Sequence, residues 1–196
     1  MENNMVQEAA PKYNYYSPAE YLELERASDE KHEYFDGQVY NMAGASMNHV
    51  QVSANVFIST GSFLKGKECS IYSSDLKVTN KQKDAYTYPD LLIVCGKKEF
   101  DDEMADVLLN PSVIIEILSL STRSIDKGRK FFYYQEIKSL NEYFMIDTIK
   151  QRVFTARKQP DERWLTELPV ETGSIFIETI NFHLSLSDIY NGTGIE

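Results

Sequence analysis

Two carboxylates stand inside apolar runs of the sequence, where a charged side chain is out of place. Asp90 lies near the start of the run YPDLLIV (residues 88–94), and Glu116 lies in the middle of VIIEIL (residues 113–118). Such runs are typical of buried β-strands, where an ionised carboxylate is costly unless something pairs with it. A divalent cation is one such partner, because Mg²⁺ prefers carboxylate and water oxygens as ligands. If the two runs are neighbouring strands, both carboxylates project from one end of a sheet.

Each carboxylate also has a purely structural explanation. An aspartate after a proline is common in turns, so Asp90 is equally well explained as the first residue of a strand. Glu116 would alternatively form a buried salt bridge with a lysine or an arginine, although buried glutamates are scarce. Glu33 is a third candidate ligand, but it lies in a charged stretch between His32 and Tyr34 and indicates little by itself.

A helix predicted after the second apolar run offers a cation. It is expected to start at Ser121 or Thr122 and to continue to about Gln135, with Ser119 and Thr122 acting as caps. Three apolar side chains on or just after it are expected to face the core: Ile125, Phe132 and Ile137. The basic side chains Lys127, Arg129 and Lys130 then cover other faces, where solvated lysines are common. Alternatively, Lys130 folds back to the carboxylates and stabilises a negatively charged transition state.

Local signals predict the elements that would position these residues. Ser17 before Pro18 predicts a helix start, and residues 31–42 predict a hairpin that turns at Asp36-Gly37. Ser46 predicts the start of a helix that runs to about residue 64 and carries His49. Strand-like runs then extend from Cys69 to the C-terminus, interrupted by the helix after Glu116. We therefore expect an α/β fold in which helices flank a central mixed β-sheet.

Length, composition and charge limit the classes of protein to which the chain can belong. The chain has 196 residues, 42% hydrophobic and 26% charged, which predicts one domain over residues 15–196 after a disordered tail at 1–14. No apolar run reaches the ~18 residues of a membrane span, and the N-terminus does not read as a signal peptide, so we expect a cytoplasmic protein. Cys69 and Cys95 are expected to be small core residues in a reducing compartment. The net charge of −10 argues against non-specific binding to polyanions.

An ordered set of residues resembles a known family. The set includes Glu33 before Asp36-Gly37, Tyr88-Pro89-Asp90, and Glu116-Ile117-Leu118-Ser119 with Lys130 on the following helix. It also includes these positions: Ser46, His49, Asp126, Tyr134, Ile137, Glu142, Tyr143, Ile146, Asp147 and the run 182–190. From about residue 16 onward the chain resembles the Uma-type restriction endonucleases of the PD-(D/E)XK nuclease superfamily.

The resemblance implies a restriction-endonuclease-like core, a DNA phosphodiester substrate, a Mg²⁺ or Mn²⁺ cofactor and a homodimer. Glu33, Asp90 and Glu116 match the metal-holding positions, and these three with Lys130 match the catalytic set. The chain departs from the superfamily at Leu118, where lysine is usual; Lys130 would supply the missing cation. His49 is either a structural residue of its helix or, as the resemblance allows, a supporting residue near the site. Tyr134 is either a packing residue or a stacking or hydrogen-bonding group near the substrate.

Two other functions compete with a nuclease. The first is a catalytically silent nuclease fold that acts as a dimeric binding or regulatory module, which the acidic net charge and Leu118 favour. The second is a glycosidase with paired carboxylates, against which the short chain and the lack of an aromatic sugar platform argue. Clustering of Lys130 with the three carboxylates would favour the nuclease, whereas a carboxylate site without a lysine would favour the silent module.

Overall fold

The computed structural model describes residues 15–42, 44–80, 82–119 and 123–196. The predicted disordered tail therefore lies outside the described residues. The helical elements are α1 (Pro18–Ala27), α2 (Met47–Leu64), α3 (Arg123–Ile125), the π-helical turn η1 (Asp126–Lys130), α4 (Phe131–Tyr134), the 3₁₀ turn η2 (Glu178–Ile180) and α5 (Leu186–Ile189). No helix within these ranges is long and apolar enough to cross a membrane.

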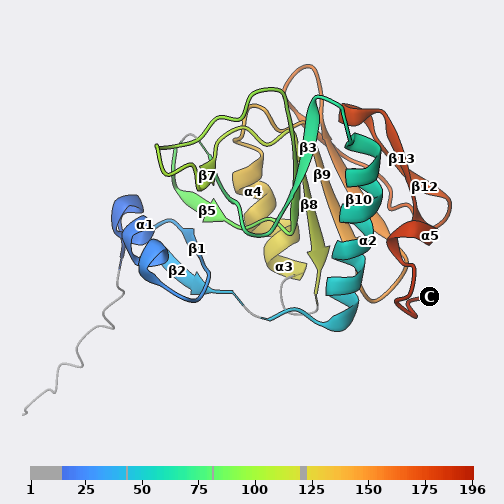
Figure 1. Ribbon diagram of the computed structural model, residues 1–196, viewed down its shortest axis with the longest axis horizontal. Coiled ribbons are helices and arrows are strands. Elements are labelled where there is room, and N and C mark those ends of the chain that lie inside the picture. The colour runs from blue at the N-terminus through green and yellow to red at the C-terminus, as the bar shows by residue number, and fades with distance from the viewer. Residues whose placement is uncertain (1–14, 43, 81, 120–122) are drawn as a thin grey trace, which may run out of the picture.

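The main sheet has six strands in the order β11-β10-β9-β8-β6-β3. Its strands are β3 (Cys69–Ser73), β6 (Leu91–Cys95), β8 (Val113–Leu118), β9 (Glu142–Asp147), β10 (Val153–Lys158) and β11 (Trp164–Thr166). Only β8 and β9 pair in parallel, joined through the helical segment α3–η1–α4, and the other neighbours are antiparallel. The predicted mixed sheet flanked by helices is therefore confirmed (Figure 1).

Two hydrophobic clusters lie on opposite faces of the main sheet, and successive residues of the central strands belong to alternate clusters. Ile115 and Ile117 face α2 and the hairpin of β12 (Ser174–Ile177) and β13 (Phe182–Ser185), whereas Ile114 and Leu118 face the side of α4. Figure 1 shows α2 and this hairpin on one side of the sheet and α3 and α4 on the other. Since strand side chains alternate between faces, Glu116 belongs to the α4 side.

A second, five-stranded sheet lies beside the α4 face. Its order is β2-β1-β5-β4-β7, with strands β1 (His32–Phe35), β2 (Gln38–Asn41), β4 (Lys77–Thr79), β5 (Ala85–Thr87) and β7 (Val107–Leu108). Asp36 and Gly37 both have positive φ, at 46° and 87°, as a two-residue hairpin turn requires. This hairpin carries Glu33, so the second sheet contributes one of the predicted site residues.

The predicted helix starts agree with the structure where it describes them. Ser17 forms a capping box with Glu20, and the Ser46 hydroxyl accepts from the His49 backbone N–H at the start of α2. The predicted start at residues 121–122 lies outside the described residues; nearby, the Ser119 carbonyl accepts from the Arg123 backbone N–H at 3.1 Å.

Two predictions about side chains are wrong. Ile125 and Phe132 are 39% and 64% exposed, because the face that the segment turns inward carries Asp126, Lys130 and Tyr134 instead; Ile137 is buried as predicted. Cys69 and Cys95 are not separate core thiols. They lie directly opposite each other on β3 and β6 and form a disulfide, which the predicted reducing environment does not anticipate.

Candidate active site

Asp90 and Glu116 meet at one end of the main sheet. Strands β6 and β8 pair antiparallel with Leu91 opposite Ile115, so the next positions outward are Asp90 and Glu116. The Asp90 backbone N–H donates to Glu116 Oε2 at 3.2 Å, and the Ile117 backbone N–H donates to Asp90 Oδ2 at 2.7 Å. The two carboxylates are thus fixed to each other's strands by backbone hydrogen bonds.

Lys130 supplies the cation that faces Glu116. Its Nζ lies 3.2 Å from Glu116 Oε1 and 3.6 Å from Asp126 Oδ1, and all three residues are buried. The helical segment after β8 crosses the α4 face of the sheet, which brings Lys130 back over the strand that carries Glu116. A buried ammonium group needs such partners, because desolvation otherwise disfavours its charge.

Glu33 joins the same cluster from the second sheet. Its Oε1 atom lies 2.8 Å from Lys130 Nζ and accepts from the Tyr88 backbone N–H at 3.1 Å. The bond to Tyr88 ties β1 to the segment that leads into Asp90. All four predicted site residues are therefore brought together, with Lys130 bridging the carboxylates of Glu33 and Glu116.

His49 and Tyr134 complete the polar surroundings. His49 Nε2 lies 3.2 Å from Asp90 Oδ2; burial lowers the pKa of His49, but the nearby Asp90 carboxylate outweighs it and the net shift is upward. The Tyr134 hydroxyl donates to Glu116 Oε1 at 2.8 Å, and burial together with the Glu116 and Glu33 charges raises the pKa of Tyr134 well above its usual range. Tyr134 therefore acts as a neutral hydrogen-bond donor.

Negative charge exceeds positive charge in the cluster. Burial raises the pKa of Glu116 well above its usual range, and Asp90, Asp126 and Glu33 raise it further, while Lys130 opposes the shift. Burial lowers the pKa of Lys130, but the surrounding carboxylates outweigh this effect and raise it, so the lysine stays protonated. One lysine cannot neutralise four carboxylates, which leaves the site electrostatically suited to a further cation.

The carboxylate oxygens of the site are ligands of the type that Mg²⁺ and Mn²⁺ prefer. Among the described residues, no hydrogen bond or ion pair reaches the second oxygens, Glu33 Oε2 and Asp90 Oδ1. Oxygens of one or two carboxylates, completed by water, suffice for Mg²⁺. As placed, however, no three His, Cys, Asp or Glu side chains in the described ranges converge on one point. Lys130 lies between Glu33 and Glu116 instead, so the fit is to a pair of carboxylates rather than a ready-made triad.

Two buried carboxylates near the site were missed from the sequence. Asp126 was noted only as part of the resemblance, yet it lies 3.6 Å from Lys130. Glu25, on α1, accepts from the His32 backbone N–H and from the Tyr88 hydroxyl, and so holds the neighbours of Glu33 and Asp90. Glu25 follows Tyr21 by four residues and Leu22 by three. This helical spacing could have placed it on the buried side of α1 from the sequence alone.

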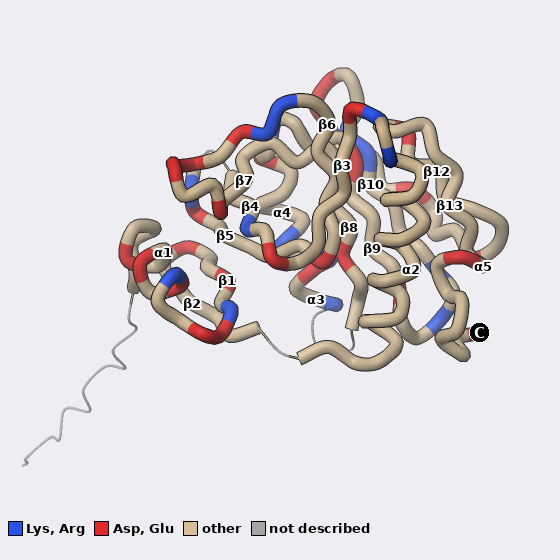
Figure 2. The backbone as a smooth tube through the Cα atoms, in the orientation of Figure 1, with Lys and Arg blue, Asp and Glu red and all other residues tan. Residues whose placement is uncertain are grey.

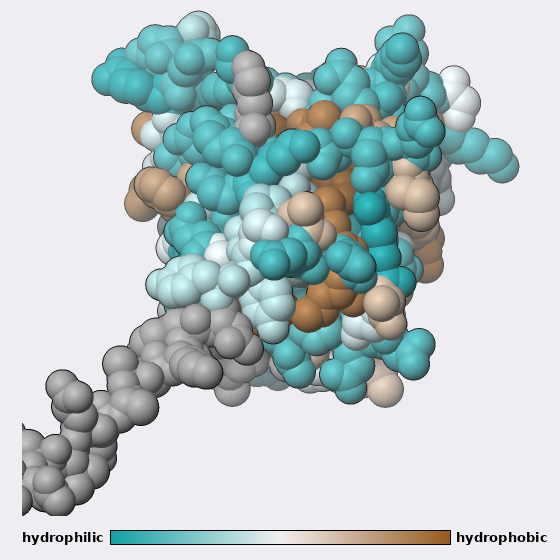
Figure 3. All heavy atoms as spheres, turned by 90° about the vertical axis from the view of Figure 1, so that its left-hand side faces the viewer, coloured by the Kyte–Doolittle hydropathy of each residue, from teal (hydrophilic) through white to brown (hydrophobic). Residues whose placement is uncertain are grey.

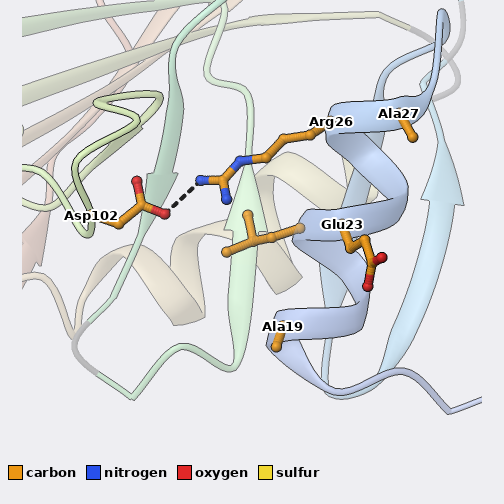
Figure 4. Close-up of a pocket in the computed structure, with 6 residues that line it drawn as sticks. Ala19, Glu23, Arg26, Ala27 and Asp102 are labelled. Carbon is orange, nitrogen blue, oxygen red and sulfur yellow. Dashed lines mark hydrogen bonds and ion pairs between the residues drawn. The ribbon is translucent and has the colours of Figure 1, made fainter.

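A shallow pocket elsewhere on the molecule is separate from this cluster. It lies between α1 and the loop before β7, and its lining residues are Ala19, Leu22, Glu23, Arg26, Ala27 and Asp102. Figure 4 shows Arg26 reaching across to Asp102, at 2.7 Å. This surface ion pair bridges the pocket, whose lining includes none of the predicted site residues.

A mixed sheet flanked by helices, with carboxylates and one lysine gathered at one end, is the restriction-endonuclease-like class that the sequence predicts. The model of the Uma2 family, described as "Putative restriction endonuclease", matches residues 18–187, and the chain belongs to this family. The resemblance drawn from the sequence is thereby confirmed.

Two relatives come from Synechocystis sp. (strain ATCC 27184 / PCC 6803 / Kazusa). "Uncharacterized protein slr1290" is 32% identical over 176 residues, covering 90% of this chain and 92% of the relative. "Uncharacterized protein sll1609" is 35% identical over 158 residues, covering 80% of this chain and 89% of the relative. Both alignments span most of each chain, so the likeness is not confined to the site.

The fold is also similar to a crystal structure of "a putative nuclease belonging to DUF820" from Anabaena variabilis ATCC 29413. The TM-score is 0.73 at 21% sequence identity, covering 89% of this chain and 97% of that chain. At this identity the match shows a shared fold.

Proposed function

We propose that this protein is a metal-dependent endonuclease that hydrolyses phosphodiester bonds in DNA. The observation that carries the proposal is the contact of Lys130 Nζ with the carboxylates of both Glu33 and Glu116, at 2.8 and 3.2 Å, beside Asp90. The lysine is in the carboxylate cluster although the strand position where the superfamily usually has it is Leu118. Clustering of Lys130 with the three carboxylates is the arrangement that favours the nuclease over the silent module.

In this proposal the carboxylates hold the metal ion, and the lysine stabilises negative charge on the substrate. Asp90 and Glu116, with Glu33 directly or through water, would hold Mg²⁺ or Mn²⁺. The bound ion would lower the pKa of water and polarise the phosphoryl oxygen. Lys130 would orient the attacking water and stabilise the charge that develops on the phosphate. His49 holds Asp90 in place, and Tyr134 holds Glu116 through its hydroxyl group.

Plasmid nicking in Mg²⁺ or Mn²⁺ tests the proposal. The variants are Glu116→Gln and Asp90→Asn, which preserve shape but remove charge. The control is Lys138→Ala, because Lys138 is exposed on the turn after α4. We expect cleavage by the wild type and Lys138→Ala and about a hundredfold or greater loss in both carboxylate variants. No cleavage by any of the proteins, with metal binding demonstrated, would favour the silent module.

The resemblance also implies a homodimer, which forms part of the proposal. Sedimentation equilibrium of the full chain would measure the mass in solution, and a single species at the monomer mass of 22.6 kDa would contradict it.

A further inference from the structure

A group of three cations lies beside the candidate active site. Arg123, Lys127 and Arg152 surround Asp147, the last residue of β9, and are called the basic cluster here. Arg123 and Lys127 belong to the same helical segment as Lys130, and Figure 2 shows basic positions along that segment next to acidic ones. The helical segment α3–η1 therefore contributes residues to both the proposed nuclease site and the basic cluster.

Strand register places the cluster relative to Glu116. Glu116 is opposite Met145 in the parallel pair of β8 and β9, and Leu118 is opposite Asp147. Asp147 is thus one strand over and two residues further along, on the same face of the sheet as Glu116. Two residues of strand span about 7 Å, and one DNA strand rises about 3.4 Å per phosphate. The offset therefore equals the rise of about two phosphates along one strand.

The two arginines already satisfy Asp147. Its carboxylate is fully buried and accepts from Arg123 Nη2, from Arg152 Nη2 at 2.7 Å and from the Ile149 backbone N–H at 2.9 Å. The Nε atoms of Arg123 and Arg152 are buried and lack a hydrogen-bond partner within the described part of the chain. The cluster thus contains more cationic donors than its one carboxylate accepts.

Lys127 adds a third positive charge that the fold does not require for charge balance. Its Nζ lies 3.3 Å from the centroid of the Phe154 ring, and the Arg152 guanidinium lies 4.9 Å from the same centroid. Partial burial and then the Arg123 and Arg152 charges lower the pKa of Lys127, and Asp147 only partly offsets them. Lys127 is therefore not the solvated lysine that the sequence predicts. It is a cation held against like charges.

We propose that the basic cluster binds a backbone phosphate of the DNA substrate, close along the strand to the phosphate that is cleaved. The inference rests on the proposed function and adds to it a contact that positions the strand. The three side chains are partly exposed, so an anion can reach them. A chain with net charge −10 repels DNA as a whole, so productive binding needs a local positive site beside the carboxylates.

Lys127→Ala is the diagnostic variant, and Lys67→Ala is its matched control. Lys67 also stacks on an aromatic ring, with Nζ 3.0 Å from the Phe63 centroid, but it follows the far end of α2, next to the Cys69–Cys95 end of the sheet. Binding of each full-length protein to a fluorescein-labelled DNA duplex is measured by anisotropy in Ca²⁺ buffer at several salt concentrations. Thermal unfolding is measured in parallel.

We expect Lys127→Ala to weaken DNA binding roughly tenfold at low salt and to reduce the slope of log K against log salt by about one. Its melting temperature should equal or exceed that of the wild type, because like-charge repulsion is removed. Lys67→Ala should bind as the wild type does. If Lys127 had only a structural role, its removal would not weaken DNA binding while leaving the melting temperature unchanged or higher.

Three outcomes would count against the proposals in different ways. Wild-type binding with no difference between Lys127→Ala and Lys67→Ala would overturn the phosphate site and leave the proposed nuclease intact. Specific loss in Lys127→Ala without any DNA cleavage by the wild type would support the phosphate site and overturn the nuclease activity. No DNA binding by the wild type would overturn both.

Discussion

The Glu116 carboxylate accepts a hydrogen bond from the backbone N–H of Asp90, while the Asp90 carboxylate accepts one from the backbone of β8. Each carboxylate is therefore anchored by the strand of the other. The arrangement holds two acidic side chains close together despite their repulsion, and it leaves Asp90 Oδ1 free of hydrogen bonds and ion pairs to the described residues. Lys130 then offsets part of the negative charge.

Lys130→Ala should abolish cleavage and also destabilise the protein. Lys130 is buried against Glu33, Glu116 and Asp126 and is not a solvated lysine of the helix surface. Its removal leaves buried carboxylates unpaired, which typically costs about 3 kcal/mol or more. Urea unfolding at neutral pH measures the loss, with Lys138→Ala as the exposed control. Equal stability of the two variants would contradict the observed burial of the lysine's charge.

Unlike Lys130→Ala, Glu116→Gln should not lower the free energy of unfolding. Burial and three neighbouring carboxylates disfavour the charge of Glu116, whereas Lys130 keeps Glu33 and Asp126 as partners when that charge is removed. The amide oxygen can still accept from Tyr134, although the amide NH2 group then replaces the oxygen that accepts from the Asp90 backbone N–H. We therefore expect an inactive variant whose free energy of unfolding is unchanged or about 1 kcal/mol higher. A large loss of stability would show that the Glu116 charge is needed for folding.

Mg²⁺ or Mn²⁺ should raise the melting temperature of the wild type. A ligand that binds only the folded state adds RT ln(1 + [L]/Kd), about 1–3 kcal/mol near saturation. Differential scanning fluorimetry with millimolar metal, followed by excess chelator, measures a reversible shift. The Glu116→Gln variant should show a smaller shift, and an identical shift in both proteins would place the bound ion elsewhere.

Acid should weaken the junction between α1 and the second sheet. The Arg26 guanidinium and Lys77 hold the pKa of Asp106 at about 2, below its ordinary 3.8, although burial opposes the shift. Because the folded-state pKa is lowered, the stabilisation is present above about pH 4 and is lost as the pH falls through 2. Asp106→Asn should be less stable than the wild type at pH 7, and the difference should vanish below pH 2. Asp29→Asn, at an exposed position, is the control.

Reduction should destabilise the protein. The Cys69–Cys95 disulfide closes a loop with a sequence separation of 26, for which the loop-entropy relation gives about 3.5 kcal/mol. Denaturant unfolding with and without dithiothreitol measures the difference. The double variant Cys69→Ser, Cys95→Ser should match the reduced wild type and be insensitive to reductant. Identical midpoints for the oxidised and reduced wild type would argue against the bond.

Local sequence signals predicted the elements that depend on neighbouring residues. The capping box at Ser17, the turn at Asp36-Gly37 and the helix start at Ser46 each involve contacts within three residues, so their information is contained in short stretches. The mixed sheet followed from strand-like runs separated by a helix. The exposed Ile125 and Phe132 were predicted wrongly because the buried face of this segment carries the charged residues Asp126 and Lys130, which hydrophobicity does not identify as interior.

Strand register decided what the sequence left open. The disulfide could not be predicted from two isolated cysteines, because it depends on β3 and β6 pairing with Cys69 opposite Cys95. The involvement of Asp126 and Glu25 likewise depends on packing between elements distant in sequence.

The sequence by itself determined that Asp90 and Glu116 are carboxylates in apolar strands, which makes a partner for each an energetic necessity. Only the tertiary structure determines which residues are those partners. Glu33, Lys130 and His49 come from a hairpin, a later helix and an earlier one, and chain segments of such different sequence separation meet only through the packing of two sheets. The free energy of a buried charge fixes the need for a counter-charge, but only the three-dimensional path of the chain determines which residue supplies it.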